Sequence, residues 1–166
     1  MLLTTQSPEE TEKIGQKLAS WCLNRLEKEK RAVVLNLEGD LGGGKTTFVR
    51  GLARGLGVSH PITSPTFVLA RRYPVQAGNL KNFYHLDFYR LEKEDDRFLD
   101  QINFRQIIDR SENIVAIEWS ERLGHLRPSG LILCFVFKSE HQREITLKGE
   151  TDLLNQAKAY LYGKSS

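Results

Sequence analysis

The 166-residue sequence has few of the features that mark specialised classes of protein. Its two cysteines, Cys22 and Cys134, form no Cys-x-x-Cys pair, which argues against a disulfide framework or a zinc site and favours a reduced compartment. The longest apolar stretch, residues 131–137, is too short to span a membrane. Residues 1–6 show no basic segment that leads into an apolar one, so we expect no signal peptide. These absences predict a cytoplasmic protein that does not bind a membrane.

The composition excludes further classes. Hydrophobic residues make up 40% of the chain and charged residues 27%, which is typical of a folded globular protein rather than a disordered one. The length suits a single domain over residues 1–166. The net charge of +3 is too small to indicate a surface that coats DNA, and a polyanionic ligand explains it equally well.

One segment carries a specific motif. Residues 39–46 read Gly-Asp-Leu-Gly-Gly-Gly-Lys-Thr and satisfy the pattern G-x-x-x-x-G-K-[ST] of a phosphate-binding loop. The apolar residues 32–37 before it predict a strand, and apolar residues at helical spacing predict a helix over residues 46–54. Strand, loop and helix in this order are the context in which the pattern binds phosphate. A glycine-rich turn that merely precedes a lysine is the weaker interpretation.

The residue types of the loop suit a nucleoside triphosphate. Gly42, Gly43 and Gly44 leave room for backbone N–H groups to point at the phosphates, and the N-terminus of the following helix adds partial positive charge. Lys45 is placed to reach the β- and γ-phosphates, and the Thr46 hydroxyl is a ligand for Mg²⁺. Thr47 completes the predicted nucleotide-binding residues of the loop.

The other segments predict a sheet with helices on it. Ser7, Pro8 and Glu10 form a strong helix start, followed by an apolar stripe up to Leu26. Residues 66–73 and 82–89 are expected to form an antiparallel hairpin with a turn at 78–79. An acidic run at 92–96 then leads into a helix with apolar residues from 98 to 108. The remaining expected elements are buried strands at 113–117 and 131–137, an edge strand at 144–147 and a closing helix at 152–162. Both cysteines are expected to be buried. The predicted fold is a P-loop NTPase-like α/β domain with a mixed sheet flanked by helices.

Hydrolysis of a nucleotide also requires carboxylates, and two are well placed. Glu118 follows the apolar residues 114–117, at the strand end that faces the ligand crevice of an open α/β sheet. A glutamate that simply faces solvent fits this pattern equally well. Asp87 lies in an alternating segment and shares one strand face with His85 and Tyr89. Solvent exposure of that face is again an equal alternative.

Four segments taken together resemble one family. They are residues 39–47, residues 64–67 (Ser-Pro-Thr-Phe), residues 84–91 (Tyr-His-x-Asp-x-Tyr-Arg-Leu) and residues 117–121 (Ile-Glu-Trp-Ser-Glu). In this order and at these spacings they resemble the TsaE family, formerly YjeE, the small bacterial ATPase of tRNA threonylcarbamoyladenosine synthesis. The likeness extends from Ser7 to the strand of Arg143. At Gly43 the family usually has alanine, and we expect the glycine to loosen the loop slightly.

The resemblance implies a role for each candidate residue of the catalytic set. Thr46 and Glu118 would hold Mg²⁺, which decides in favour of a metal-binding Glu118. Asp87 would lie near the γ-phosphate, either among the groups that hold the metal's waters or positioning the attacking water. Lys45, Asp87 and Glu118 would together form the catalytic residues.

Further roles follow from the same resemblance. Ser64 and Thr66 would belong to a switch segment whose hydroxyls sense the γ-phosphate. Trp119 would face a partner near the site, although a core aromatic is an equal alternative. Thr11 would contribute to nucleotide contact because its helix lies beside the nucleotide in the family, and a polar residue of the first helical turn is the alternative.

The resemblance implies hydrolysis of ATP with Mg²⁺ that drives the cycle of a partner. We expect hydrolysis by the isolated chain to be slow, because no arginine finger is evident near the motifs in the sequence. That partner would be the TsaB–TsaD complex, which transfers threonylcarbamoyl to adenosine of tRNA, so that tRNA is reached only through the complex. ATP-bound and ADP-bound forms would differ in their affinity for it.

Two rival hypotheses use the same loop. A small-molecule kinase would need an acceptor pocket and a lid with arginines, for which Arg71, Arg72, Arg105 and Arg110 are candidates. A nucleotide-binding adaptor without catalysis, or a GTPase-like switch, is the second. The sequence contains no Asn-Lys-x-Asp motif to read guanine, which argues against GTP.

Overall fold

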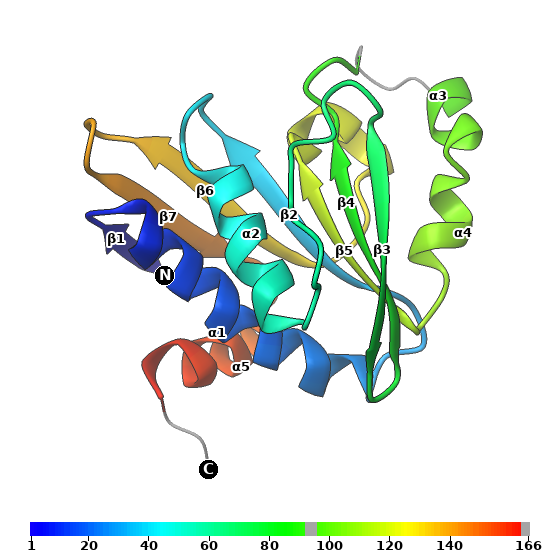
Figure 1. Cartoon of the computed structure of the whole chain (residues 1–166), viewed down its shortest axis with the longest axis horizontal. Helices are drawn as coiled ribbons and strands as arrows, with labels where there is room; N and C mark the ends of the chain where they lie inside the picture. The colour runs from blue at the N-terminus through cyan, green and yellow to red at the C-terminus, as the bar shows by residue number, and fades with distance from the viewer. Residues whose placement is uncertain (92–95, 164–166) are drawn as a thin grey trace.

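Seven β-strands form one sheet in the order β1-β7-β6-β2-β5-β4-β3 in the computed structural model, which describes residues 1–91 and 96–163 (Figure 1). The strands are β1 (Leu2–Thr5), β2 (Val33–Gly39), β3 (Ala70–Ala77), β4 (Leu80–Asp87), β5 (Asn113–Glu118), β6 (Leu131–Phe137) and β7 (Arg143–Lys148). The helices are α1 (Pro8–Leu26), α2 (Lys45–Gly55), α3 (Asp96–Gln101), α4 (Phe104–Ile108) and α5 (Thr151–Tyr162), with a 3₁₀ segment η1 (Ser120–Leu126).

The middle of the sheet is parallel and its outer strands are antiparallel. β2 pairs in parallel with β5 and with β6, and β4 is parallel to β5. β3, β7 and β1 pair antiparallel with their neighbours. This is the mixed sheet with a hairpin that the sequence predicts. Because parallel strands end at the same edge of a sheet, the segments that follow β2, β4 and β5 begin side by side.

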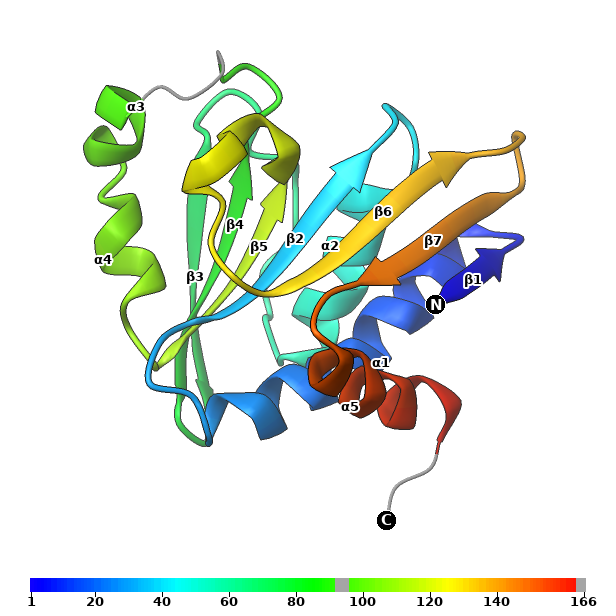
Figure 2. The same cartoon turned by 180° about the vertical axis from the view of Figure 1, so that it is seen from behind.

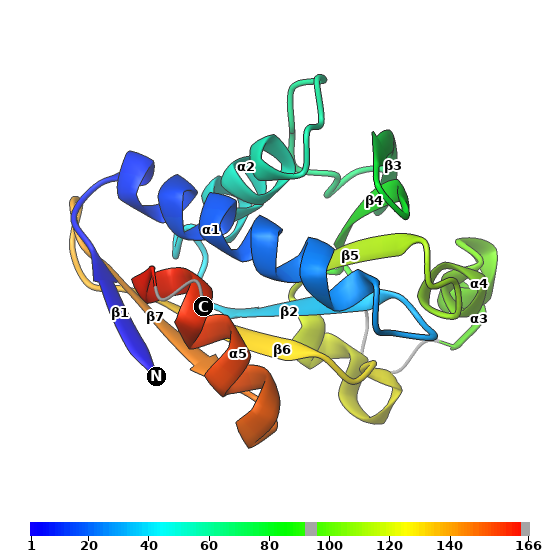
Figure 3. The ribbon, with the colours of Figure 1, turned by 90° about the horizontal axis from the view of Figure 1, so that it is seen from below.

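Helices pack on both faces of the sheet. On one face α1, α2 and α5 share a core with the strands through residues such as Leu18, Phe48 and Leu161. On the other face α3, α4 and η1 pack around Phe88 and Ile117. Figure 3 shows α1 and α2 above the sheet and η1, in yellow, below it. From behind, Figure 2 shows η1 in front of the β4–β5 part of the sheet, while β6 and β7 lie open to view.

The first helix begins where the sequence predicts. The Ser7 hydroxyl accepts a hydrogen bond from Glu10 N at 3.3 Å, and the Glu10 carboxylate accepts one from Gln6 N at 2.7 Å. Pro8 occupies the first turn, where its missing N–H costs no helical hydrogen bond. Among the described residues, no helix is both long enough and apolar enough to cross a membrane.

The predicted hairpin forms, but its first strand is displaced along the chain. Residues 66–69 form a turn, and β3 begins only at Ala70. It then continues through Pro74 to Ala77, over part of the segment predicted as a loop. Proline is tolerated there because β3 is an edge strand, so one side of its backbone makes no ladder hydrogen bonds. The turn at residues 78–79 is confirmed.

Three other expectations are wrong. The helix expected from residue 98 to 108 is interrupted at Asn103, whose φ of +55° is left-handed and separates α3 from α4. The strand predicted at an edge, residues 144–147, is internal because the short strand β1 pairs outside it. Cys22 is buried, and burial raises the pKa of its thiol, but Cys134 is only partly buried. Most of the acidic run, residues 92–95, lies outside the described residues.

Two glycines bring α1 and α2 into backbone contact. A Cβ atom at Gly51 would lie 2.0 Å from Glu12 O, and one at Gly15 would lie 2.3 Å from Phe48 O. Neither distance leaves room for a side chain. Because α2 starts at Lys45, directly after the phosphate loop, this contact fixes the position of the loop on the sheet.

Alanine at Gly51 tests this contact. In an exposed helix the change would add up to about 1 kcal/mol of stability. Here we expect it to lower the free energy of unfolding by about 1–3 kcal/mol, because α1 must move away. Arg50→Ala, at the exposed neighbouring position, is the matched control and should change stability by less than about 0.5 kcal/mol. Urea unfolding measures both variants, and a Gly51→Ala protein as stable as wild type would contradict the close approach.

Candidate nucleotide-binding site

The loop between β2 and α2 has a conformation that requires glycine. Gly39 and Gly44 have φ angles of +104° and +100°, which side chains rarely adopt. A Cβ atom at Gly39 would also lie 2.1 Å from Phe135 O on the neighbouring strand β6. The loop leads directly into α2, and the first N–H groups of a helix have no acceptor within the helix. An anion that enters the loop can therefore accept hydrogen bonds from it.

Lys45 lies folded against the loop. Its Nζ donates hydrogen bonds to Gly39 O at 2.6 Å and Asp40 O at 2.7 Å, and lies 3.8 Å from the centre of the Trp119 ring. Burial lowers the pKa of Lys45, and nearby carboxylates, first that of Glu118, act against this shift by favouring the charged amine. The ammonium group is thus held at the site by oxygen atoms whose place a phosphate oxygen can take.

Thr46 and Glu118 meet at the carboxyl edge of the sheet. The register of β2 with β5 pairs Leu37 with Glu118, which places the end of β5 beside the loop that follows β2. Thr46 Oγ1 donates to the Glu118 carboxylate, at 2.8 Å from Oε1 and 3.0 Å from Oε2. Glu118 is only 3% exposed, so the alternative of a solvent-facing glutamate is wrong. Both groups are hard oxygen donors of the kind that Mg²⁺ prefers.

Asp87 holds the segment that contains Ser64 and Thr66. Its Oδ2 accepts hydrogen bonds from Ser64 Oγ at 2.8 Å and from Thr66 Oγ1 at 2.5 Å. Its Oδ1 accepts one from Tyr89 N at 2.9 Å. Asp87 is 2% exposed and pairs with Glu118 in the register of β4 and β5, so two buried carboxylates end neighbouring strands. The alternative that Asp87 lies on a solvent-exposed strand face is therefore wrong.

A cavity of about 430 Å³ collects almost all of the predicted site residues. It is lined by residues 40–47 and by Ser64, Thr66, Asp87, Tyr89, Glu118 and Trp119. Thr11 is not among them; it is buried, and its hydroxyl lies 2.9 Å from that of Thr5. Thr11 lines a second hollow of about 70 Å³ together with Arg143, and this hollow shares Gly42, Gly44 and Thr47 with the cavity. The four arginines considered for a kinase line neither hollow.

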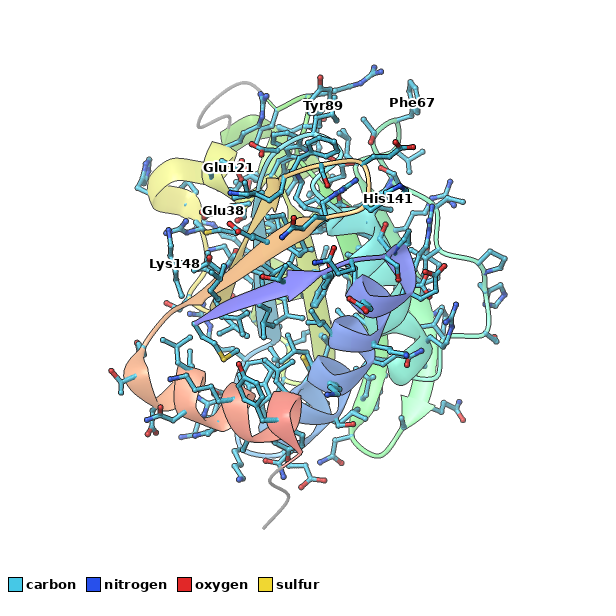
Figure 4. The ribbon with its side chains drawn as sticks, turned by 90° about the vertical axis from the view of Figure 1, so that its left-hand side faces the viewer. Glu38, Phe67, Tyr89, Glu121, His141 and Lys148 are labelled. Carbon is cyan, nitrogen blue, oxygen red and sulfur yellow. The ribbon has the colours of Figure 1, made fainter. Side chains whose placement is uncertain are left out.

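The mouth of the cavity has an aromatic and apolar rim. Trp119 is half-buried, and its ring lies 5.1 Å from that of Tyr89. Phe67 is 81% exposed and Leu41 is 73% exposed. Figure 4 shows Phe67 and Tyr89 at the same end of the molecule. Exposed apolar side chains that gather at one place are typical of an interaction surface.

Three residues contact this site although the sequence patterns indicate no role for them. His85 is buried, and its Nε2 lies 2.8 Å from Glu118 Oε1. Glu121 accepts a hydrogen bond from Gly39 N at 3.3 Å, and Arg143 donates one from Nε to a loop carbonyl at 2.8 Å. The shared strand face of His85 and Asp87 is a signal that can reveal His85. Nothing local connects Arg143 with a loop residue 101 positions earlier.

The donor groups fit a magnesium ion that is shared with phosphate. Within residues 1–91 and 96–163, no three His, Cys, Asp or Glu side chains are grouped so as to hold a metal. A Mg²⁺ ion bound through phosphate oxygens and water needs only one or two protein groups, and Thr46 and Glu118 provide them. Among the described residues that line the cavity, three carboxylates, those of Asp40, Asp87 and Glu118, face one cation, Lys45, and a divalent cation would balance this charge.

The loop, its lysine and threonine, and the buried carboxylate on the neighbouring strand define a P-loop NTPase-like α/β protein. The family model described as "Threonylcarbamoyl adenosine biosynthesis protein TsaE" matches residues 5–147. This chain belongs to the TsaE family.

Individual relatives agree with the family match. A tRNA threonylcarbamoyladenosine biosynthesis protein TsaE from a Nostoc species is 44% identical over 116 residues, which are 68% of this chain and 69% of the relative. The protein of that name from Haemophilus influenzae is 36% identical over 153 residues, 91% of this chain and 92% of the relative. The crystal structure of Bacillus subtilis YdiB is similar with a TM-score of 0.70 and 27% identity, covering 99% of this chain and 96% of YdiB.

Loss of the Asp87 carboxylate should release the segment that it holds. In Asp87→Ala, Ser64 and Thr66 each lose a hydrogen bond to a carboxylate. A hydrogen bond to a charged group contributes about 1.5–3 kcal/mol of stability. We expect the amides of residues 66–69 to exchange with deuterium at least about tenfold faster, while the amides of β5 keep their protection. Asp109→Ala, which removes an exposed ion pair, is the control and should leave this segment unchanged. Equal exchange of residues 66–69 in the Asp87 variant and wild type would show that other contacts hold the segment.

Proposed function

We propose that this TsaE-family chain binds and hydrolyses ATP with Mg²⁺, in support of threonylcarbamoyladenosine synthesis in tRNA. The observation that carries the proposal is the contact between Thr46 and the buried Glu118 beside an intact phosphate loop. The relatives' names, which place those proteins in the biosynthesis of tRNA threonylcarbamoyladenosine, support the pathway.

The phosphates would bind to the loop and to the N-terminus of α2. The backbone N–H groups of residues 42–44 and the side chain of Thr47 would contact the phosphate oxygens. Lys45 would leave the carbonyl oxygens of Gly39 and Asp40 and bind the β- and γ-phosphates instead. These carbonyls lie in the same loop, so the exchange requires only a change of side-chain conformation.

The catalytic residues would act on both sides of the γ-phosphate. Thr46 and Glu118 would hold Mg²⁺, which neutralises charge on the phosphate oxygens when it is bound. Asp87, opposite Glu118 in the sheet, would orient the attacking water, either directly or through a water of the ion. We favour water positioning, because the Asp87 carboxylate lines the cavity in its own right.

Ser64 and Thr66 would report the state of the nucleotide. Their hydroxyls donate hydrogen bonds to the carboxylate of Asp87, which is also the group that would orient water. A γ-phosphate in the cavity competes for these hydroxyls, so the segment has two arrangements that depend on whether ATP or ADP is bound. This difference would alter the affinity for a partner.

The nucleoside end of ATP would face the smaller hollow. Thr11 Cγ2 lies 3.6 Å from the position of a Cβ atom at Gly44, so Thr11 packs next to the loop. The guanidinium group of Arg143, which also lines this hollow, lies 4.3 Å from the centre of the Phe137 ring. Thr11 would therefore contribute to nucleotide binding by packing, since its hydroxyl already contacts Thr5.

The partner would be the TsaB–TsaD complex, and this chain would reach tRNA only through it. The exposed rim around Phe67 and Leu41 and the half-buried Trp119 offer a surface that continues from the cavity, so a partner there senses the nucleotide. The cytoplasm is the place of action in this proposal, because tRNA is the substrate of the pathway. A small-molecule kinase remains the alternative; the arginines that it would require lie outside both hollows.

Substitution of the two carboxylates tests the ATPase. Glu118→Gln should weaken Mg²⁺-dependent nucleotide binding and stop hydrolysis, because a neutral amide holds the ion poorly. Asp87→Asn should bind ATP nearly as wild type but lose about 10²- to 10³-fold in turnover, the usual scale for a lost positioning base. Phosphate release and ATP affinity are measured for each, with Asp109→Asn as an exposed control. If both site variants hydrolyse ATP like wild type, the two carboxylates have no part in catalysis.

A second test concerns the partner. Hydrolysis by the isolated chain should be slow and should rise when TsaB and TsaD are added, because none of the described arginines lines the cavity to stabilise charge and a partner can order the rim. Trp119→Ala should reduce this stimulation more than it reduces ATP affinity. Tyr162→Ala removes an aromatic residue of α5 that is 63% exposed, and should leave stimulation intact. A chain that is indifferent to TsaB and TsaD would favour a stand-alone enzyme such as a kinase.

A further inference from the structure

His85 contacts the proposed metal ligand from inside the sheet. It lies on β4, is completely buried, and its Nε2 is 2.8 Å from Glu118 Oε1. In the register of β4 and β5, His85 is opposite Ala116 and Asp87 is opposite Glu118. His85 and Glu118 are therefore diagonal neighbours on one face, and the small side chain of Ala116 leaves room for the imidazole to reach along β5.

The hydrogen bond has a defined direction. A carboxylate only accepts, so the imidazole donates its N–H from Nε2. Its other nitrogen, Nδ1, is buried without a hydrogen-bond partner among the described residues. Among the described residues, the contact with Glu118 is therefore the one hydrogen bond of this completely buried ring, and it determines the orientation of the ring.

His85 does not line the cavity, whereas Glu118 does. Thr46 and His85 both donate to Oε1 of Glu118, Thr46 from α2 and His85 from β4. Two donors on different elements restrict rotation of the carboxylate at the end of the glutamate side chain. A ligand that is held in one orientation binds its ion more tightly than one that must first be ordered.

We propose that His85 is a positioning residue, which fixes the Glu118 carboxylate for Mg²⁺ through its Nε2–H hydrogen bond. The inference rests on the proposed function, because it takes Glu118 as a ligand of the nucleotide's magnesium ion. It goes beyond that function by giving a buried residue outside the cavity control over metal affinity. Packing alone predicts a different result, since a side chain of similar volume would then serve equally well.

The test compares nucleotide affinity with and without metal. The probe is ADP that carries a fluorescent N-methylanthraniloyl group, titrated in Mg²⁺ and in EDTA. In His85→Leu, the gain in affinity from Mg²⁺ should fall about 10- to 100-fold, while affinity in EDTA stays within about twofold of wild type. His85→Gln keeps an N–H donor near the position of Nε2 and should restore most of the gain. Phe83→Leu is the packing control, because Phe83 is completely buried on the same strand face.

Each outcome decides the matter. The inference is overturned if His85→Leu keeps the wild-type gain from Mg²⁺, if His85→Gln loses as much as His85→Leu, or if Phe83→Leu loses it equally. Should His85→Leu fail to fold, as judged by thermal melting, His85→Met replaces it with the same expected result. A wild-type chain that binds the probe in neither buffer would overturn the proposed function itself. Magnesium-dependent binding that all three variants share with wild type would overturn only the role of His85.

Discussion

The site depends on the burial of one carboxylate, that of Glu118. Removing a carboxylate from water costs several kcal/mol unless donors and a cation compensate it. Compensation comes from Thr46 at the start of α2, from His85 on β4 and from the charge of Lys45. These groups belong to different elements, so satisfying Glu118 fixes the loop, β4 and β5 relative to one another. The backbone contact of α1 with α2 at Gly51 adds a second constraint on the loop.

The same kind of contact joins the other groups of the proposed site to one another. Lys45 rests on two carbonyl oxygens and on the Trp119 ring, and Asp87 rests on two hydroxyl groups. In the proposed cycle, phosphate oxygens replace the carbonyls and a water replaces the hydroxyls. Binding would then release the segment of Ser64 and Thr66 from Asp87 as Lys45 leaves Trp119. One nucleotide would thereby change two parts of the rim that we propose as the partner surface.

Local chemistry explains which parts of this structure the sequence can predict. The helix start at Ser7 and the loop at residues 39–46 depend on short-range hydrogen bonding and backbone geometry, and both form as predicted. The sequence did not predict β1, because a strand of four residues has too little periodicity. Its partner β7 was therefore predicted as an edge strand. The interruption at Asn103 is a single left-handed residue within an apolar pattern that suits one continuous helix.

Prediction of the site has a similar limit. Lys45, Thr46 and the strand-end Glu118 follow from motif and strand pattern, and the structure brings them together. Whether Glu118 and Asp87 were buried depended on strand register, which single-strand patterns leave open. Arg143 reaches the loop through strand order alone, and the separation of Thr11 from the main cavity depends on how α1 crosses the loop. Roles such as those of Ser64 and Trp119 stay predictions until they are measured.

The central claim is that Lys45 exchanges its hydrogen bonds to two loop carbonyl oxygens for hydrogen bonds to the phosphate oxygens of a triphosphate. A crystal structure with Mg²⁺ and a non-hydrolysable ATP analogue tests it most directly. The account predicts that Lys45 Nζ leaves Gly39 O and Asp40 O, that it lies within hydrogen-bond distance of the β- and γ-phosphates, and that the ion lies beside Thr46 and Glu118. A nucleotide bound elsewhere, or a Lys45 that keeps both carbonyl contacts with the analogue in place, would contradict it.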